Sequence, residues 1–164
     1  MPVIRFDKPN TTNQLNLSKP GKYRVELAQE GIEVNINGVF QAKNKDQLEV
    51  EIIIVHQAKR TTSHTNLRGI VDNQAFLSLL GTIVVESSAK LANAFLTEKI
   101  LLLSEKSKAV AVPNLEISTD EVKCSHAATI STLSEDQLFY IQSRGLNQKT
   151  AKKMLIDGFL SLPK

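Results

Sequence analysis

The sequence LANAFLTEKILLLSEKSKAVAVPNLEISTDEVKCSHAATI, residues 91–130, decides the fold of this chain. Short apolar runs follow one another in it at intervals of six to nine residues, at 91–96, 100–103, 109–112, 115–117, 122–124 and 128–130. Each interval has room for a strand and a tight corner but not for a crossover helix, which excludes a doubly wound α/β fold. A β-sandwich and a β-helix both fit this spacing, and no strict repeat motif separates them.

The region before this stretch also predicts strands. Residues 32–36 alternate between apolar and polar side chains, which is the period-two pattern of a strand with one buried face. We interpret 23–27 and 32–36 as antiparallel strands, with turns at Gly21, Gly31 and Gly38.

The pattern changes to a helical one at Ser134. Ser134 and Gln137 form a capping box, which predicts a helix that runs to about Arg144 and ends at Gly145. Asn147 caps a second expected helix, in which Ala151, Met154, Leu155 and Phe159 fall on one stripe. The chain is therefore expected to end in a helical hairpin.

The composition bounds the function classes. The chain has 164 residues, 41% of them hydrophobic and 23% charged, and it contains one cysteine. A single cysteine excludes a disulfide framework and an iron–sulphur site held by this chain's thiolates alone. No apolar run approaches the roughly 20 residues of a membrane span, and no secretory signal is visible, so we expect a cytoplasmic protein.

The charge pattern gives little support to nucleic-acid or membrane binding. The chain has 20 Lys and Arg against 17 Asp and Glu, and the basic residues are interleaved with acids rather than gathered in a patch. We predict neither nucleic acid nor membrane as a partner.

Cys124 and His126 form a Cys-x-His pair on an expected strand, so their side chains project from the same face. Thiolate and imidazole both bind iron, but a cluster requires four ligands, so the pair is half of a site at most. The apolar residues Val122, Ala128 and Ile130 are expected on the same face of the strand as this pair. From the pattern alone, this favours an ordinary buried face without a metal site.

His56 and His64 are the other two histidines, and a turn between strands could bring them together. No carboxylate or cysteine lies nearby in the sequence to complete a metal site or a nucleophile–base pair, so we interpret both as turn or surface residues. Phosphate-binding glycine loops and nucleophile elbows are also missing, and we do not predict an enzyme.

Two stretches near the C-terminus resemble a known family. Residues 113–129, PNLEISTDEVKCSHAAT, followed by 136–145, DQLFYIQSRG, are similar to the C-terminal signature of the SufB/SufD family. The resemblance extends upstream through residues 100–104, Gly81 and Gly69, and more weakly to His56 and 62–63. It covers roughly residues 50–164.

The family resemblance implies a role in the SUF system of iron–sulphur cluster assembly. It implies a right-handed parallel β-helix core over residues 1–132 and a C-terminal helical domain over 133–164. It further implies that His126, with Cys124, lies near an interface with a SufB-like subunit or a second copy, where iron or a cluster is held transiently.

The same resemblance implies that the C-terminal helices bind SufC, the ATPase of that system. The expected docking residues are Leu138, Phe139, Tyr140, Arg144, Met154 and Phe159. From the residues alone, packing of the hairpin against the β-domain is at least as well supported.

Single positions make the chain similar to the SufD type. SufB-type members carry a functional cysteine where this chain has Lys99, and a glutamate where it has Ala127. We therefore expect a non-catalytic SufD-like component that lacks the N-terminal helical domain of longer members. The alternative is a structural or interaction module that has kept the β-solenoid and lost the cluster function.

Overall fold

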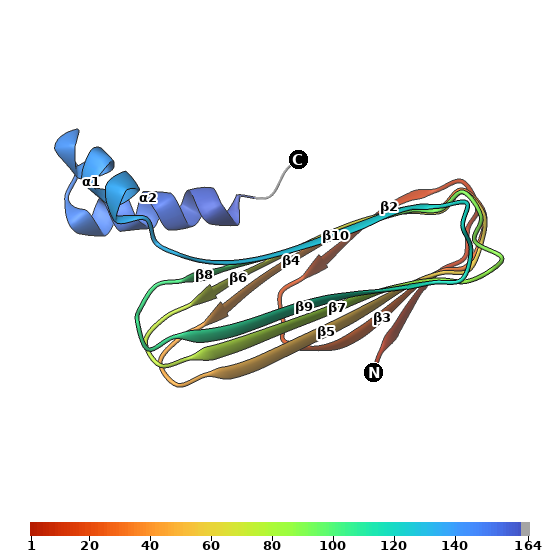
Figure 1. Cartoon of the computed structure of the whole chain (residues 1–164), viewed down its shortest axis with the longest axis horizontal. Coiled ribbons are helices and arrows are strands. Elements are labelled where there is room, and N and C mark those ends of the chain that lie inside the picture. Colours follow the sequence, from red (N-terminus) through yellow and green to blue (C-terminus); the bar gives the residue numbers. More distant parts are fainter. Residues whose placement is uncertain (162–164) are drawn as a thin grey trace.

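The computed structural model describes residues 1–161, in which ten strands are followed by two helices. The strands wind into a flattened solenoid of two sheets, and the helices extend from one end of its last strand (Figure 1). Successive strands alternate between the two sheets, so each turn of the chain adds one strand to each sheet.

Both sheets are built from parallel neighbours two elements apart in the sequence. Sheet A contains, in spatial order, β1 (Val3–Phe6), β3 (Gly21–Leu27), β5 (Gln47–His56), β7 (Phe76–Val85) and β9 (Lys108–Ile117). Sheet B contains β2 (Thr12–Leu17), β4 (Glu33–Ala42), β6 (Thr62–Val71), β8 (Asn93–Leu102) and β10 (Lys123–Thr132). This arrangement confirms the expected parallel β-helix and excludes the β-sandwich, whose strands would run antiparallel.

In-register stacking places like residues above one another inside the solenoid. Val25, Ile54 and Ile83, on successive strands of sheet A, form one inward row, and each is fully buried. Every second residue of each strand joins such a row, so the period-two patterns of the sequence become continuous apolar ladders. Burial of these ladders is the main stabilising contribution to the β-domain.

The expected antiparallel opening is wrong. The strands over 23–27 and 32–36 lie in different sheets: β3 pairs in parallel with β1 and β5, and β4 with β2 and β6. Gly31 does lie at a corner with a φ of +72°, but Gly38 is inside β4. A solenoid corner and a hairpin turn use the same residue types, so the local pattern does not distinguish them.

Glycines inside the strands make room for large side chains of the neighbouring rows. A Cβ added to Gly69 would lie 2.2 Å from Cδ2 of Leu77, and one added to Gly38 would lie 2.7 Å from Cδ2 of Leu67. These distances are far below van der Waals contact, so the close packing of the interior depends on glycine at both positions.

The helical hairpin forms as expected. Helix α1 (Glu135–Ser143) begins after Ser134, whose hydroxyl accepts a hydrogen bond from the Gln137 amide at 3.2 Å. The chain then turns at Gly145, with a φ of +93°, and α2 (Gln148–Leu160) begins after the Asn147 cap.

Helix α2 runs back over the outer face of sheet B (Figure 1). Ile70 and Leu101 point outward from β6 and β8 but are buried, with exposed fractions of 2% and 6%. Arg68 Nη1 donates hydrogen bonds to the carbonyl oxygens of Ser161, at 2.7 Å, and Phe159. A cation at the carbonyl end of a helix is favourable, so Arg68 fastens the end of α2 to sheet B.

The break between the two parts lies between Thr132, where β10 ends, and Glu135, where α1 begins. The division into independent domains at 132/133 stays a prediction, since each part would have to be produced alone to test it. No helix within residues 1–161 is both long and apolar enough to cross a membrane.

A substitution at Gly69 tests the interior packing. Because a methyl group would overlap Leu77, we expect Gly69→Ala to lower the free energy of unfolding by about 1–3 kcal/mol, measured by urea denaturation. The matched control is Gly158→Ala in α2, where no atom lies within 4 Å of the added Cβ. The control should lose no stability, and equal stability of both variants would contradict this account of the core.

Candidate binding site at the free end of the solenoid

The last turn of the solenoid has a free edge in each sheet. Within residues 1–161, β9 pairs only with β7, and β10 pairs only with β8. The rows of inward side chains therefore end at these two strands without a further turn to cover them. Ile117 and Ile130, which face inward in these strands, are consequently exposed, whereas Val110 and Val112 are exposed on the outer face of β9.

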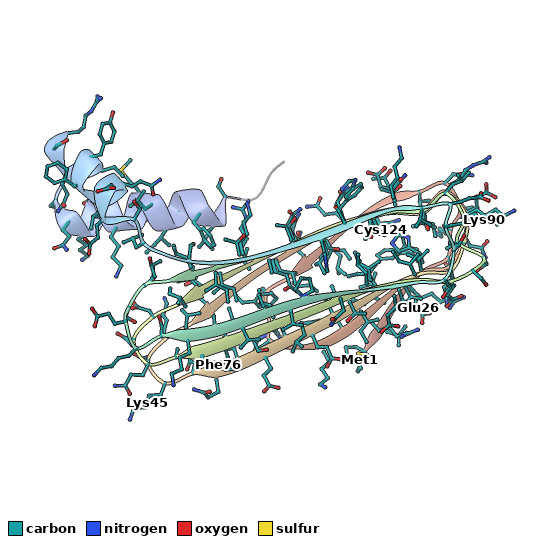
Figure 2. The ribbon with its side chains drawn as sticks, in the orientation of Figure 1. Met1, Glu26, Lys45, Phe76, Lys90 and Cys124 are labelled. Carbon is teal, nitrogen blue, oxygen red and sulfur yellow. The ribbon has the colours of Figure 1, made fainter. Side chains whose placement is uncertain are left out.

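Cys124 and His126 lie on the uncovered inward face of β10. Cys124 is in register with Ala94 of β8, and His126 with Leu96, both of which point inward and are buried. The sequence correctly places the pair on one face with Ala128 and Ile130, but the face is not buried. The Cys124 side chain is half-buried and His126 is exposed, because within residues 1–161 no strand pairs with the outer edge of β10. Figure 2 shows Cys124 on β10.

The backbone of β10 adds unpaired donors beside this pair. The amide of Lys123 donates to the Ala92 carbonyl, and in a parallel ladder alternate residues donate to the same neighbour. The amides of Cys124 and His126 therefore face the free edge. In sheet A the same alternation directs the backbone of residue 113 toward the free edge of β9, but Pro113 has no N–H group to donate. The edge of β10 is the more open of the two.

The donor set at the free end suits iron but is incomplete. Partial burial raises the pKa of the Cys124 thiol. The thiol therefore keeps its proton in the free chain, and a bound metal ion would have to displace this proton. Among the residues that the structure describes, no three His, Cys, Asp or Glu side chains are close enough together to hold a metal ion.

A buried carboxyl group lies one turn below this end. Glu98 points inward from β8, directly beneath Ala128 of β10, and is fully buried. Neither of its carboxyl oxygens has a hydrogen-bond partner in the described part of the chain. Burial raises the pKa of Glu98 to about 7, because the charged form loses its hydration.

His56 is not a surface residue, which corrects our expectation. It ends β5 pointing inward with no exposed surface, and its ring nitrogens lie 2.8 Å from the hydroxyls of Thr61 and Ser63. Burial lowers the pKa of His56 to about 4, so the ring is neutral near pH 7. The pairing of two hydroxyls with a histidine is a structural network, since it lies beyond the reach of solvent.

His64 lies apart from His56. It points outward from β6 and stacks on Phe95 of β8, with ring centroids 5.0 Å apart and an interplanar angle of 7°. The turn between β5 and β6 therefore places the two histidines on opposite faces rather than together.

The expected docking residues of the hairpin divide into two groups. Phe139, Tyr140 and Met154 are exposed, Phe139 to 72%. Arg144, also exposed, donates a hydrogen bond to the Tyr140 hydroxyl at 2.6 Å and lies over its ring. Leu138 and Phe159 are half-buried: Leu138 lines a cleft between the hairpin and the end of β8, and Phe159 lies at the Arg68 contact.

Two buried polar residues were missed by the sequence analysis, although the signal was present. Leu96, Glu98 and Ile100 alternate with outward residues, and Ile52, Ile54 and His56 do the same. Period-two counting from the apolar neighbours would have placed both Glu98 and His56 inside.

Within residues 1–161 these features define a class of protein: a parallel β-solenoid whose last turn is uncovered and carries a thiol and an imidazole, followed by a helical hairpin with exposed apolar side chains. Residues 18–159 match the family described as "SUF system FeS cluster assembly, SufBD core domain". The match covers most of the chain, which therefore belongs to the SufBD core domain family, as the sequence resemblance indicates.

Curated relatives carry names of the same system. The chain is 46% identical over 90 residues to an iron-sulfur cluster assembly SufBD family protein of Synechocystis, which covers 55% of this chain and 20% of that protein. It is 33% identical over 144 residues to the chloroplastic protein ABCI7 of Arabidopsis thaliana, covering 86% and 30%. It is 29% identical over 134 residues to SufD of Escherichia coli, covering 82% and 32%. The chain thus spans a third or less of the length of these relatives.

The buried carboxyl predicts a specific pH dependence of stability. The pKa of Glu98 is raised from 4.5 to about 7 on folding, so its ionisation costs the folded state stability as pH rises through this range. Glu98→Gln should match wild type at pH 4 and exceed it by roughly 3 kcal/mol in unfolding free energy above pH 7.

Urea denaturation between pH 4 and 8.5 measures this difference. The control is Glu116→Gln, an exposed carboxyl on the outer face of β9, which should change the unfolding free energy by less than about 0.5 kcal/mol. A constant difference between Glu98→Gln and wild type across the pH range would show that Glu98 is not the buried acid described.

Proposed function

We propose that this chain is a non-catalytic, SufD-type component of the SUF system that supports iron–sulphur cluster assembly. In this proposal His126, with Cys124, provides part of a site for iron at the free end of the solenoid. The hairpin provides the contact with a SufC-like ATPase. The observation that carries the proposal is membership of the SufBD core domain family together with an exposed His126 at an uncovered edge.

The chemistry of the pair supports iron as the cargo. Thiolate and imidazole bind iron well, and Cys124 and His126 are on one face of one strand, so one metal ion can reach both. A cluster takes four ligands, so the remaining ones come from a second chain. In this proposal the site is complete only at an interface.

The free edge of β10 supports a partner subunit at the same place. A ten-residue edge strand with unpaired amides is a template for strand pairing with another chain. The partner is a SufB-like subunit or a second copy of this chain, and pairing along β10 would bring its ligands beside His126. This chain has Lys99 and Ala127 where SufB-type members carry a cysteine and a glutamate. A SufB-like partner would supply both ligands, so it completes the site better than a second copy of this chain does.

The hairpin supports the contact with the ATPase. Phe139, Tyr140 and Met154 leave apolar surface exposed, and Tyr140 lines a shallow apolar depression with Ile141 and Leu155. Exposed aromatic side chains around an apolar depression are typical of protein-docking sites. Arg68 holds the C-terminal end of α2 at Phe159 and Ser161, and within residues 1–161 Phe139, Tyr140 and Met154 stay exposed.

Iron loading tests the role of His126. We expect His126→Ala, reconstituted anaerobically with its SufB-like partner, to retain less than about a tenth of the wild-type iron, because an imidazole ligand is removed. His64→Ala is the matched control, since His64 lies on the outer face of β6 and should leave iron loading unchanged. Equal iron content in His126→Ala and wild type would favour the alternative, an interaction module without a cluster function.

Binding of the ATPase tests the hairpin. We expect Phe139→Ser to weaken binding to a SufC-like ATPase by about tenfold or more, measured by isothermal titration calorimetry, because an exposed aromatic anchor is lost. Val110→Ser is the control, since Val110 is an exposed apolar residue of β9, away from the hairpin. An unchanged affinity of Phe139→Ser would remove the hairpin from the proposed docking site.

A further inference from the structure

Glu98 has no role in the function proposed so far, and it is chemically exceptional. Its side chain is fully buried, and neither carboxyl oxygen makes a hydrogen bond of normal geometry within residues 1–161, although the nearby Gly81 backbone favours the charged form in part. Native proteins rarely keep a buried carboxyl without a partner, because desolvation of the charge is costly. A group of this kind requires an explanation beyond the packing of the core.

The interior is shaped to hold this side chain. Gly81 of β7 faces Glu98 from the opposite sheet, and a Cβ added to Gly81 would lie 2.6 Å from Oε1 of Glu98. The carboxyl group therefore reaches across the core to a position where only glycine leaves space. Two residues at two distant positions cooperate to accommodate one acid, which distinguishes Glu98 from an accidental polar substitution.

Glu98 lies one strand away from the free end of the solenoid. Ala128 lies above it in the ladder of sheet B, and Pro113 lies above Gly81 in sheet A, both in the last turn. One layer of small side chains thus separates the carboxyl from the uncovered end. His126 is two residues before Ala128 on the same inward face of β10, which places its α-carbon about 8 Å from that of Glu98.

Only the Gly81 backbone offsets the cost of the Glu98 charge, and it does so in part. The inward neighbours on its own and adjacent strands are Leu96, Ile100 and Leu67, all apolar. Lys99 follows Glu98 in the chain but projects from the opposite, exposed face. Apolar material transmits an electric field more effectively than water does, so the charge acts most strongly through the thin last turn.

We propose that Glu98 is a positioning residue for the iron ion at His126, supplying a buried negative charge that attracts the cation to the free end. The residue acts through the field and not as a ligand, because its carboxyl lies inside the core. This inference rests on the proposed iron site at His126. It explains why the chain keeps an acid that destabilises the metal-free fold.

The test uses Co²⁺ as an air-stable probe of the divalent site, with the full chain bound to its SufB-like partner at pH 8, where the Glu98 carboxyl is largely ionised. Co²⁺ affinity is measured by competition with a chelating dye for wild type, Glu98→Gln, Glu116→Gln and His126→Ala. We expect Glu98→Gln to raise Kd about tenfold, because the buried charge is lost with its shape retained. Glu116→Gln removes an equal but exposed charge and should change Kd less than about twofold.

A second readout separates positioning from a purely structural role. Glu98→Gln should raise the melting temperature of the metal-free chain, yet show a smaller rise on addition of Co²⁺ than wild type does. If His126→Ala weakens Co²⁺ binding and Glu98→Gln does not, the role of Glu98 is overturned and the iron site stands. If neither variant changes Kd, the iron site at His126 fails, and the inference about Glu98 fails with it.

Discussion

In-register stacking of parallel strands is the constraint on which the rest of this molecule depends. Each turn forms backbone hydrogen bonds with the turn before it and covers the inward side chains of that turn. The stability of every turn therefore depends on its two neighbours. The last turn receives this support on one side only. Free amides, exposed apolar side chains and the Cys124–His126 pair therefore occur together at β9 and β10 because of the architecture itself.

The same constraint explains which features the sequence could reveal. Helix boundaries were predictable because Ser134, Gly145 and Asn147 act locally, through caps and a left-handed turn. The density of short apolar runs predicted a solenoid or a sandwich, and the family resemblance selected the solenoid. Strand direction in the opening region was not predictable, because corner and hairpin residues look alike and the partner of each strand is some thirty residues away.

The candidate site was predictable in part for a related reason. The common face of Cys124 and His126 follows from two-residue periodicity, but their exposure depends on β10 being the last strand of its sheet, which no local pattern encodes. To predict the burial of Glu98 and His56, the apolar residues at alternate positions of their strands would have had to count for more than the polarity of these two side chains. A carboxyl opposite Gly81 depends on packing between two sheets, and only the three-dimensional arrangement shows that contact.

The central claim is that the free edge of β10 is where a partner subunit and iron meet, and amide hydrogen exchange tests it most directly. Exchange at the Cys124 and His126 amides is measured by NMR in the free chain and in its complex with a SufB-like subunit. The account predicts fast exchange at both amides in the free chain and strong protection in the complex, with the Lys123 amide, already bonded to Ala92, protected in both states. Unchanged exchange at Cys124 and His126 in a complex that has formed would place the partner elsewhere and contradict the account.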